Sequence, residues 1–371
     1  MFRLSLHSNA AFPALLFLAV EALCLPTAGA QHYRWTNLTA DQAGIATNTD
    51  ANLVNPWGLS RSAGSPWWVS DNGTGLSTLY DGTGAAKPLV VTVPTGDPSV
   101  SSTGTPTGTV FNGGTGFELA PGKPALFLFV TEDGTVSGWN PGVNPTSAVI
   151  HVNTKGASVF KGAALATVTF HDHTSAPYLF VADFRKGRVQ IYDAQFKRVR
   201  LEGDAFEDES LPSGYAPFNV QNIGGDIYVT FAKQDDQKHD EVDGPGRGFV
   251  DVFTPAGRLV RRLEHGSWLN GPWGVAVASG DFGIYSHDLL IGQFGSGAIA
   301  VYDPATGRYI DSLRDSNESI IKISGLWDIS FGSGGGSGSA TSLYFTAGSD
   351  GEQHGLFGTL APVENTVGNS Q

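Results

Sequence analysis

The chain has 371 residues, with 35 acidic against 22 basic side chains and a formal net charge of −13. This acid excess argues against nucleic acid and anionic membranes as partners, because both require a basic footprint. The single cysteine, Cys24, lies near the N-terminus, so the rest of the chain has no disulfide, thiolate nucleophile or cysteine metal site.

Residues 1–30 have the pattern of a targeting segment. Arg3 gives a positive start, residues 10–25 are mainly apolar, and small residues before Ala30 suit a cleavage site. We therefore expect a signal peptide at 1–30, a folded domain at 31–363 and a polar C-terminal tail at 364–371. The mature protein is expected to be secreted or periplasmic, with no membrane span after signal cleavage.

After a first predicted strand at 33–38, the chain repeats one pattern six times. Each copy has a short turn, an apolar second strand that ends in a polar residue, a Gly-rich turn and a third strand closed by an aromatic residue. Repeats of about four short strands are typical of a β-propeller. Predicted second strands lie at 68–71, 127–132, 178–183, 227–230, 290–293 and 343–346. The closing aromatics are Tyr80, Trp139, Tyr192, Phe253, Tyr302 and Phe357.

The last copy has no fourth strand of its own. Fourth strands are predicted after the other copies, for example at 88–93 and 258–263, but the chain after Leu360 is a short polar tail. We expect the strand at 33–38 to complete the sixth blade, because this would remove an open sheet edge. The sequence therefore predicts an all-β fold, a six-bladed β-propeller closed by its N-terminal strand.

Polar side chains recur at two positions of the repeat. One set ends the second strands, and a closed ring could bring its members to one axis; the other set consists of asparagines near the first strands. Capping of strand ends and turns is the alternative role for both sets. The strand-end set is Asp71, Glu132, Asp183, Lys233 and Gln293, and the asparagines are Asn55, Asn219 and Asn270.

Two further segments have ligand-like composition. The segment 233–248 is the longest charged loop and includes Asp235, and carboxylates in a glycine-bearing loop suit Ca²⁺, although the spacing is not that of an EF-hand. His171, Asp172 and His173 suit zinc or copper, with a solvated loop as the alternative interpretation.

Several strings resemble a family of exported bacterial proteins of unknown function, some of which carry a PEP-CTERM sorting signal and which are related to NHL-type propellers. They lie at 52–58, 68–73, 106–112, 131–134, 232–235, 325–327 and 344–348. The resemblance covers nearly all of the mature chain and implies a propeller and export, with no established activity. At the fold level, six-bladed NHL-like hydrolases and lyases hold a central calcium ion with converging Asn, Asp and Glu side chains. That likeness implies Asn55, Asn219 and Asn270 as neutral oxygen ligands, with Asp183, Asp71 or Glu132 supplying charge.

Two functions are consistent with these features. The first is an exported scaffold that binds an unknown small molecule or protein on its loop face. The second is a Ca²⁺-dependent hydrolase or lyase with its metal on the propeller axis. Binding is favoured because no histidine occupies a repeat position that points to the axis, so no catalytic base can be named. The sequence leaves open whether the protein is an enzyme, and its oligomeric state.

Overall fold

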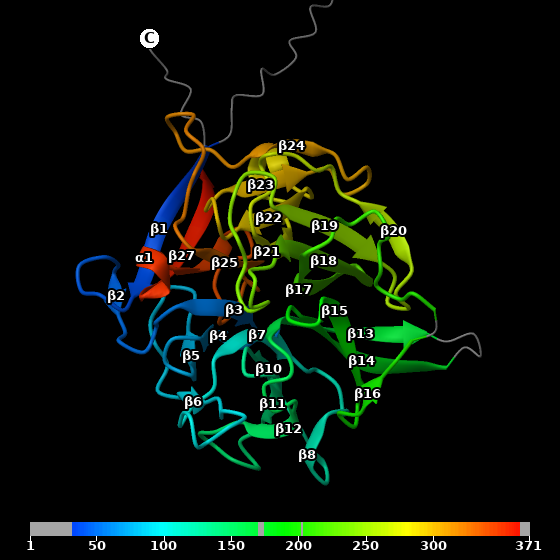
Figure 1. Ribbon diagram of the computed structural model, residues 1–371. Helices are drawn as coiled ribbons and strands as arrows, with labels where there is room; N and C mark the ends of the chain where they lie inside the picture. Colours follow the sequence, from blue (N-terminus) through cyan, green and yellow to red (C-terminus); the bar gives the residue numbers. More distant parts are fainter. Residues whose placement is uncertain (1–31, 170–173, 202, 364–371) are drawn as a thin grey trace, which may run out of the picture.

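The computed structural model describes residues 32–169, 174–201 and 203–363. They form six blades around one axis, as Figure 1 shows, so the predicted fold class is confirmed. The expected signal peptide, the C-terminal tail and the sequence from His171 to His173 lie outside the described residues. No helix of the described segments is long and apolar enough to cross a membrane.

Each blade is an antiparallel sheet whose first strand lies innermost. Blade 1 contains β3 (Pro56–Ser60), β4 (Trp67–Asp71), β5 (Leu76–Tyr80) and β6 (Val91–Thr92). Blade 2 contains β7 (Pro106–Phe111), β10 (Phe127–Thr131), β11 (Thr135–Trp139) and β12 (Val149–Asn153), beside a hairpin of β8 (Glu118–Ala120) and β9 (Lys123–Pro124). Blade 3 contains β13 (Phe160–Thr169), β14 (Ser175–Asp183), β15 (Arg188–Asp193) and β16 (Arg198–Val199).

The other three blades follow the same order. Blade 4 contains β17 (Tyr215–Ile223), β18 (Asp226–Lys233), β19 (Gly248–Phe253) and β20 (Leu259–Arg262). Blade 5 contains β21 (Pro272–Val277), β22 (Leu289–Gln293), β23 (Ile299–Tyr302) and β24 (Tyr309–Ser312), with a 3₁₀ turn, η1, at Gly283–Tyr285. Blade 6 contains β25 (Leu326–Phe331), β26 (Leu343–Gly348), β27 (His354–Val363) and β1 (His32–Ala40), with β2 (Asn48–Thr49) at its edge and the short α1 (Ser349–Glu352).

The N-terminal strand closes the ring, as predicted. β1 pairs antiparallel with β27 from His32 opposite Val363 to Ala40 opposite Leu356, and blue β1 lies beside red β27 in Figure 1. The first strands contact one another in the order β3, β7, β13, β17, β21, β25 and back to β3. Pairing of the two chain ends thus leaves blade 6 with the same four-stranded core as the others.

Apolar side chains of the second and third strands fill the spaces between blades. The six closing aromatics predicted from the repeat are all buried, as are the apolar residues of the predicted second strands. Glycine at the third position of several first strands lets neighbouring blades approach closely. A Cβ on Gly108 of β7 would lie 2.6 Å from the backbone nitrogen of Ala163 in β13. The narrow ring therefore depends on the absence of a side chain there.

Candidate functional site

Aromatic rings fill the axis of the propeller. The second residues of β3, β21 and β25 are tryptophans that meet at the axis. Trp57 stacks on Trp327 with ring centroids 3.5 Å apart, while Trp273 meets both edge-on. Phe184, Phe218 and Phe294 pack against these indoles. We call these six residues the aromatic plug. Since five of the six are buried and Phe294 is partly buried, a ligand on the axis must bind at one end of the ring.

Lys161 is the charged member of the same inner position, one residue into β13. Its side chain is 1% exposed, and Nζ lies 4.9 Å from the centroid of Trp57. Nζ donates to Oε1 of Glu132 at 2.6 Å and to Oδ1 of Asp240 at 3.0 Å. Burial lowers the pKa of Lys161. The surrounding carboxylates, of which Glu132 has the largest effect, raise it by more, so the net pKa is raised. The lysine therefore stays charged inside the ring.

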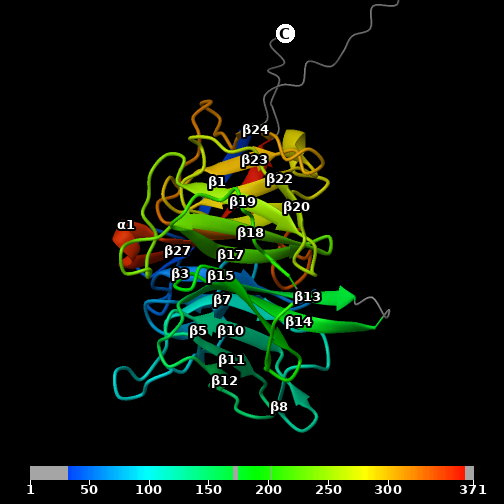
Figure 2. The ribbon, with the colours of Figure 1, turned by 45° about the vertical axis from the view of Figure 1, so that its right-hand side comes forward.

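The carboxylates around Lys161 come from three blades. Glu132 follows β10, Asp240 and Glu241 lie in the connection from β18 to β19, and Glu352 ends the kinked α1 between β26 and β27. All three connections join a second strand to a third strand and open on the same face, which we call the loop face. Figure 2 shows α1 and the yellow-green β18–β19 connection on the same side of the molecule.

Asparagines bridge these groups. Nδ2 of Asn55 donates to Oε2 of Glu352 at 2.7 Å, and Nδ2 of Asn72 donates to Oε2 of Glu132 at 2.8 Å. Nε1 of Trp327 donates to Oδ1 of Asn55 at 3.0 Å, which ties the network to the aromatic plug. We call the set the axial cluster. It consists of Asn55, Asn72, Glu132, Lys161, His239, Asp240, Glu241 and Glu352.

Backbone strain supports this geometry. Asn55 has φ of 46° and Glu352 has φ of 67°, both in the left-handed region that side-chain-bearing residues rarely adopt. Such conformations cost energy and are concentrated at functional sites. Here they place the two bonded side chains of the cluster.

The carboxyl groups of the axial cluster differ in their affinity for protons. The pKa of Glu241 is raised to about 8, chiefly by burial; Asp243 and Glu352 also raise it, and Lys161 lowers it. Burial also raises the pKa of Glu352. The hydrogen bond from His239 instead lowers the pKa of Asp240, and that same bond raises the pKa of His239. At neutral pH the cluster therefore combines an ionised Asp240 with a largely protonated Glu241.

Three side chains of the cluster have the donor arrangement of a metal site. One ligand atom each from Glu132, His239 and Asp240 lies within 4.8 Å of the others. Two carboxylates and an imidazole suit several divalent ions. Nζ of Lys161 already contacts both carboxylates, so an ion at this point would compete with the ammonium group.

The predicted calcium ligands lie in different surroundings. Asn55 belongs to the axial cluster, but Nδ2 of Asn219 donates to the carbonyl oxygen of Trp273 at 2.9 Å, within the inner ring. Oδ1 of Asn270 accepts from the backbone of Gly244, and Asp183 accepts from Gln190 within its own blade. The structure does not bond any of these four side chains to another. A metal site made by them stays a prediction.

The polar strand ends also do not form one ring. Asp71 is buried and accepts from the backbone nitrogen of Thr78, because the chain reverses tightly after β4. Oε1 of Gln293 accepts from the backbone of Asn270. Of the five strand-end residues, Glu132 is the one that contacts the buried lysine. Lys233 donates to the carbonyl oxygen of Ser213, and Asp235 accepts from the backbone of His239.

Sequence reasoning named the charged loop but missed Lys161 and Glu352. A signal for Lys161 was present, since it occupies the repeat position held by Trp57 and Trp273. No repeat signal marks Glu352, because its position depends on the kink in α1. His239 was missed because it lies in a connection whose path to the axis has no counterpart in the other copies.

The fold and the axial cluster define the protein as a six-bladed β-propeller with a charged axial site. No protein-family model matches the chain. It is 31% identical over 332 residues to the uncharacterised protein L690 of Acanthamoeba polyphaga mimivirus, covering 85% of this chain and 82% of L690. The chain belongs to the same family as L690. The uncharacterised protein R648 of that virus is 29% identical over 300 residues, covering 78% of this chain and 71% of R648.

Solved structures show the same fold at low identity. A protein of unknown function from Bacteroides thetaiotaomicron has a TM-score of 0.53 and 11% identity, covering 90% of this chain and 77% of that one. Virginiamycin B lyase from Staphylococcus aureus has a TM-score of 0.50 and 9% identity, covering 90% and 100%. These likenesses confirm the predicted relation to propellers. The relatives named above are viral, and the expected bacterial export family is not among them.

Proposed function

We propose that this protein is a ligand-binding propeller that holds a divalent cation at the axial cluster on its loop face, with Ca²⁺ as the favoured ion. The observation that carries the proposal is the convergence of carboxyl groups from blades 2, 4 and 6 around the buried ammonium group of Lys161. If all four carboxyl groups were ionised, their charge would exceed what Lys161 and a protonated His239 can neutralise. A cation beside Glu241 and Glu352 would allow both groups to ionise, and carboxylate and amide oxygens are the ligands that Ca²⁺ prefers.

The shape of the loop face supports binding. A cavity of about 520 Å³ lies on one side of the β18–β19 connection, and another of about 320 Å³, lined by Asp243 and Lys322, lies on the other. Rigid blades that present connections of different length are a common scaffold for recognition. A cation at the axis would therefore lie between two possible contact sites for a small molecule or a protein.

We also propose that the protein acts outside the cytoplasm. The support is the pattern of residues 1–30, with Arg3, an apolar stretch and small residues before Ala30. N-terminal sequencing of the protein recovered from its native host would test this. A mature chain starting at Gln31 is expected, and an intact Met1 in a cytoplasmic fraction would contradict it.

A cation titration tests the axial site. After removal of bound ions with a chelator, added Ca²⁺ is expected to raise the melting temperature of the wild type. Binding to the folded state alone stabilises by about 2.7 kcal/mol at a hundredfold excess over Kd. Glu241→Gln and Glu352→Gln are expected to lose this response, because they remove charge while keeping shape. Asp281→Asn removes one exposed carboxylate on blade 5 and serves as the matched control.

The same titration separates this site from the one predicted by sequence. If Asn219→Ala abolishes the response and Glu352→Gln does not, the ion instead binds among the asparagines near the first strands, Asn55, Asn219 and Asn270. A wild type that is indifferent to Ca²⁺, Mg²⁺ and Mn²⁺ contradicts cation binding altogether.

A metal-dependent hydrolase or lyase is the second candidate. The observation that favours it is the pair of an ionised Asp240 and a protonated Glu241 beside the Glu132–His239–Asp240 donor set. Carboxyl groups whose pKa values are pushed apart can act as base and acid. Cation-dependent turnover of an ester or lactone, with a pH profile that loses one limb in Glu241→Gln, would support this function over binding alone.

A further inference from the structure

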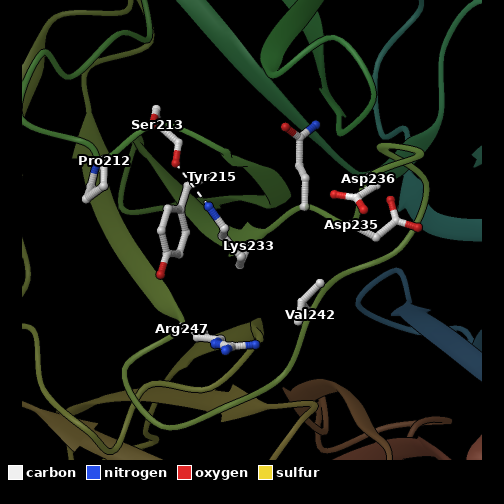
Figure 3. A pocket seen from close by; sticks show the side chains of 9 residues that line it. Pro212, Ser213, Tyr215, Lys233, Asp235, Asp236, Val242 and Arg247 are labelled. Atoms are coloured by element: carbon white, nitrogen blue, oxygen red, sulfur yellow. Dashed lines mark hydrogen bonds between the residues drawn. The ribbon is translucent and has the colours of Figure 1, made fainter.

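The cavity of about 520 Å³ on blade 4 is separate from the axial cluster. It lies between the start of β17, the end of β18 and the returning part of the β18–β19 connection. Figure 3 shows Tyr215 and Lys233 on one side of it, Arg247 across the opening, and Asp235 and Asp236 on a third side.

The cavity walls are fixed by backbone hydrogen bonds. The nitrogen of Val242 donates to the carbonyl oxygen of Lys233 at 2.8 Å, and the nitrogen of Gln234 donates to Gly214 at 2.9 Å. Arg247 is held in the same way, because its nitrogen donates to Gly244 at 2.9 Å and its carbonyl oxygen accepts from Gly271 at 3.2 Å. The backbone of the site is therefore in place before any ligand arrives, which lowers the cost of binding.

Two cations face this cavity without a carboxylate partner. Nζ of Lys233 donates to the carbonyl oxygen of Ser213 at 3.2 Å, and Nη1 of Arg247 donates to the carbonyl oxygen of Asp243 at 2.9 Å. Neither forms an ion pair with a carboxylate of the described segments. Most of their donor positions stay available to a ligand.

Tyr215 adds a third polar group and a rigid wall. The Tyr215 ring packs edge-on against Phe249 with ring centroids 4.9 Å apart. Nζ of Lys233 lies 5.3 Å from the centroid of the Tyr215 ring. The Tyr215 hydroxyl has no hydrogen-bond partner within the described part of the chain. An aromatic ring beside two cations suits an organic anion better than a bare ion.

The nearby carboxylates limit what can bind. Asp236 is exposed at the rim, and Asp243 lies close enough that Arg247 lowers the pKa of its carboxyl group, although burial raises that pKa overall. A polyanion would be repelled by these groups, whereas a small molecule with one anionic head can place it between the cations.

We propose that this cavity binds a small organic anion through a carboxylate or phosphate group. The planar guanidinium of Arg247 donates hydrogen bonds to two oxygens of the anionic group. Lys233 contributes a point charge, and the Tyr215 hydroxyl donates a hydrogen bond. The body of the ligand lies along the Tyr215 ring. This site does not depend on the axial cation.

Calorimetric titration with two probes tests the proposal and distinguishes the two head groups. Benzoate presents a carboxylate on a ring, and inorganic phosphate presents the phosphate group alone; chloride at equal ionic strength accounts for general salt effects. Binding of either probe to the wild type is expected, and Arg247→Gln and Lys233→Gln are expected to weaken it at least about tenfold. Arg258→Gln removes an exposed arginine elsewhere on blade 4 and is expected to bind as the wild type does.

Each outcome decides the question. Binding of benzoate alone identifies a carboxylate ligand, binding of phosphate alone identifies a phosphate ligand, and both support the site. Lys233→Arg keeps the charge and is expected to keep binding, which guards against a variant that merely fails to fold. No binding of either probe beyond chloride, or an equal loss in Arg258→Gln, overturns the proposal.

Discussion

Nζ of Lys161 lies 2.6 Å from Oε1 of Glu132, and this pair joins the first strand of blade 3 to the strand-end connection of blade 2. The same ammonium group contacts Asp240 of blade 4 at 3.0 Å. One buried cation therefore links three consecutive blades at the axis, directly above the indole of Trp57. Because burial of a charge is costly unless it is paired, the lysine and its carboxylates depend on one another.

Replacement of this lysine is the first prediction. Lys161→Met keeps the length of the side chain but leaves Glu132 without its cation and Asp240 with His239 alone, so we expect a loss of about 3–5 kcal/mol in the free energy of unfolding. Urea denaturation measures it. Added Ca²⁺ is expected to restore part of the loss if the axial cluster binds cations. Lys186→Met, an exposed position on blade 3, is the control, and an equal effect in both variants would contradict a special role for Lys161.

The second prediction concerns pH. The pKa of Glu241 is raised from 4.5 to about 8 in the folded state, so folding favours its protonated form. Its contribution to stability is therefore complete below about pH 4.5 and is lost as the pH rises through about 8. Glu241→Gln cannot ionise, and we expect its stability to fall less between these values, by a difference on the order of a few kcal/mol.

Thermal denaturation over this pH range measures that difference. Comparison with the wild type is needed because burial also raises the pKa of Asp328 to about 7, which adds its own loss of stability with rising pH. Parallel curves for wild type and Glu241→Gln would show that Glu241 ionises normally. Saturating Ca²⁺ is expected to flatten the wild-type curve, because a bound cation favours the ionised form.

The fold was predictable because its information is local. The alternation of the strands, the turn residues and the closing aromatics such as Tyr80 and Tyr302 recur in each copy, so six short segments independently give the same answer. Even the closure by β1 followed from the missing fourth strand of the last copy. Boundaries were less certain: the predicted strand at 88–93 is reduced to Val91–Thr92, since the flanking residues leave the sheet.

The axial cluster was harder to predict because equivalent repeat positions do not have equivalent surroundings. Asp71 and Asp183 are the last residues of their second strands, and Glu132 directly follows the end of its second strand. Asp71 and Asp183 nevertheless accept hydrogen bonds from their own blades and do not reach the axial cluster. The groups that reach the axis do so through irregular backbone, a long connection for Asp240 and a left-handed residue for Glu352. Such paths are set by tertiary contacts that no pattern in one sequence displays.

The third prediction tests the closeness of the inner ring. Gly108→Ala would place a Cβ 2.6 Å from the backbone nitrogen of Ala163, and the neighbouring strand cannot move without disturbing the ring. We expect a destabilisation of about 1–3 kcal/mol, measured by chemical denaturation. Gly64→Ala, where an added Cβ meets nothing within 4 Å, is expected to be neutral. A stable Gly108→Ala protein would mean that the blades are farther apart than described.

The fourth prediction concerns the N-terminal strand. Tyr33 of β1 is 2% exposed, its hydroxyl donates to the carbonyl oxygen of Phe282 at 2.9 Å, and its ring lies 4.6 Å from that of Phe282. It thus anchors the strand that closes blade 6 to a loop of blade 5. Tyr33→Ala removes the ring and the hydrogen bond together, and we expect a loss of about 3–5 kcal/mol. Deletion of residues 32–40 is expected to cost more, because β27 would then expose an unpaired edge.

Thermal and urea denaturation of both variants measure this contribution. Arg34→Ala alters the next residue of the same strand, whose side chain is exposed, and is expected to change stability by less than about 0.5 kcal/mol. The truncated protein is also expected to associate at high concentration, since an open strand edge pairs readily with another copy. A truncated chain that stays monomeric and melts with the intact protein would show that β1 is dispensable, and that the contacts of β25, β26 and β27 with β3 hold the ring closed.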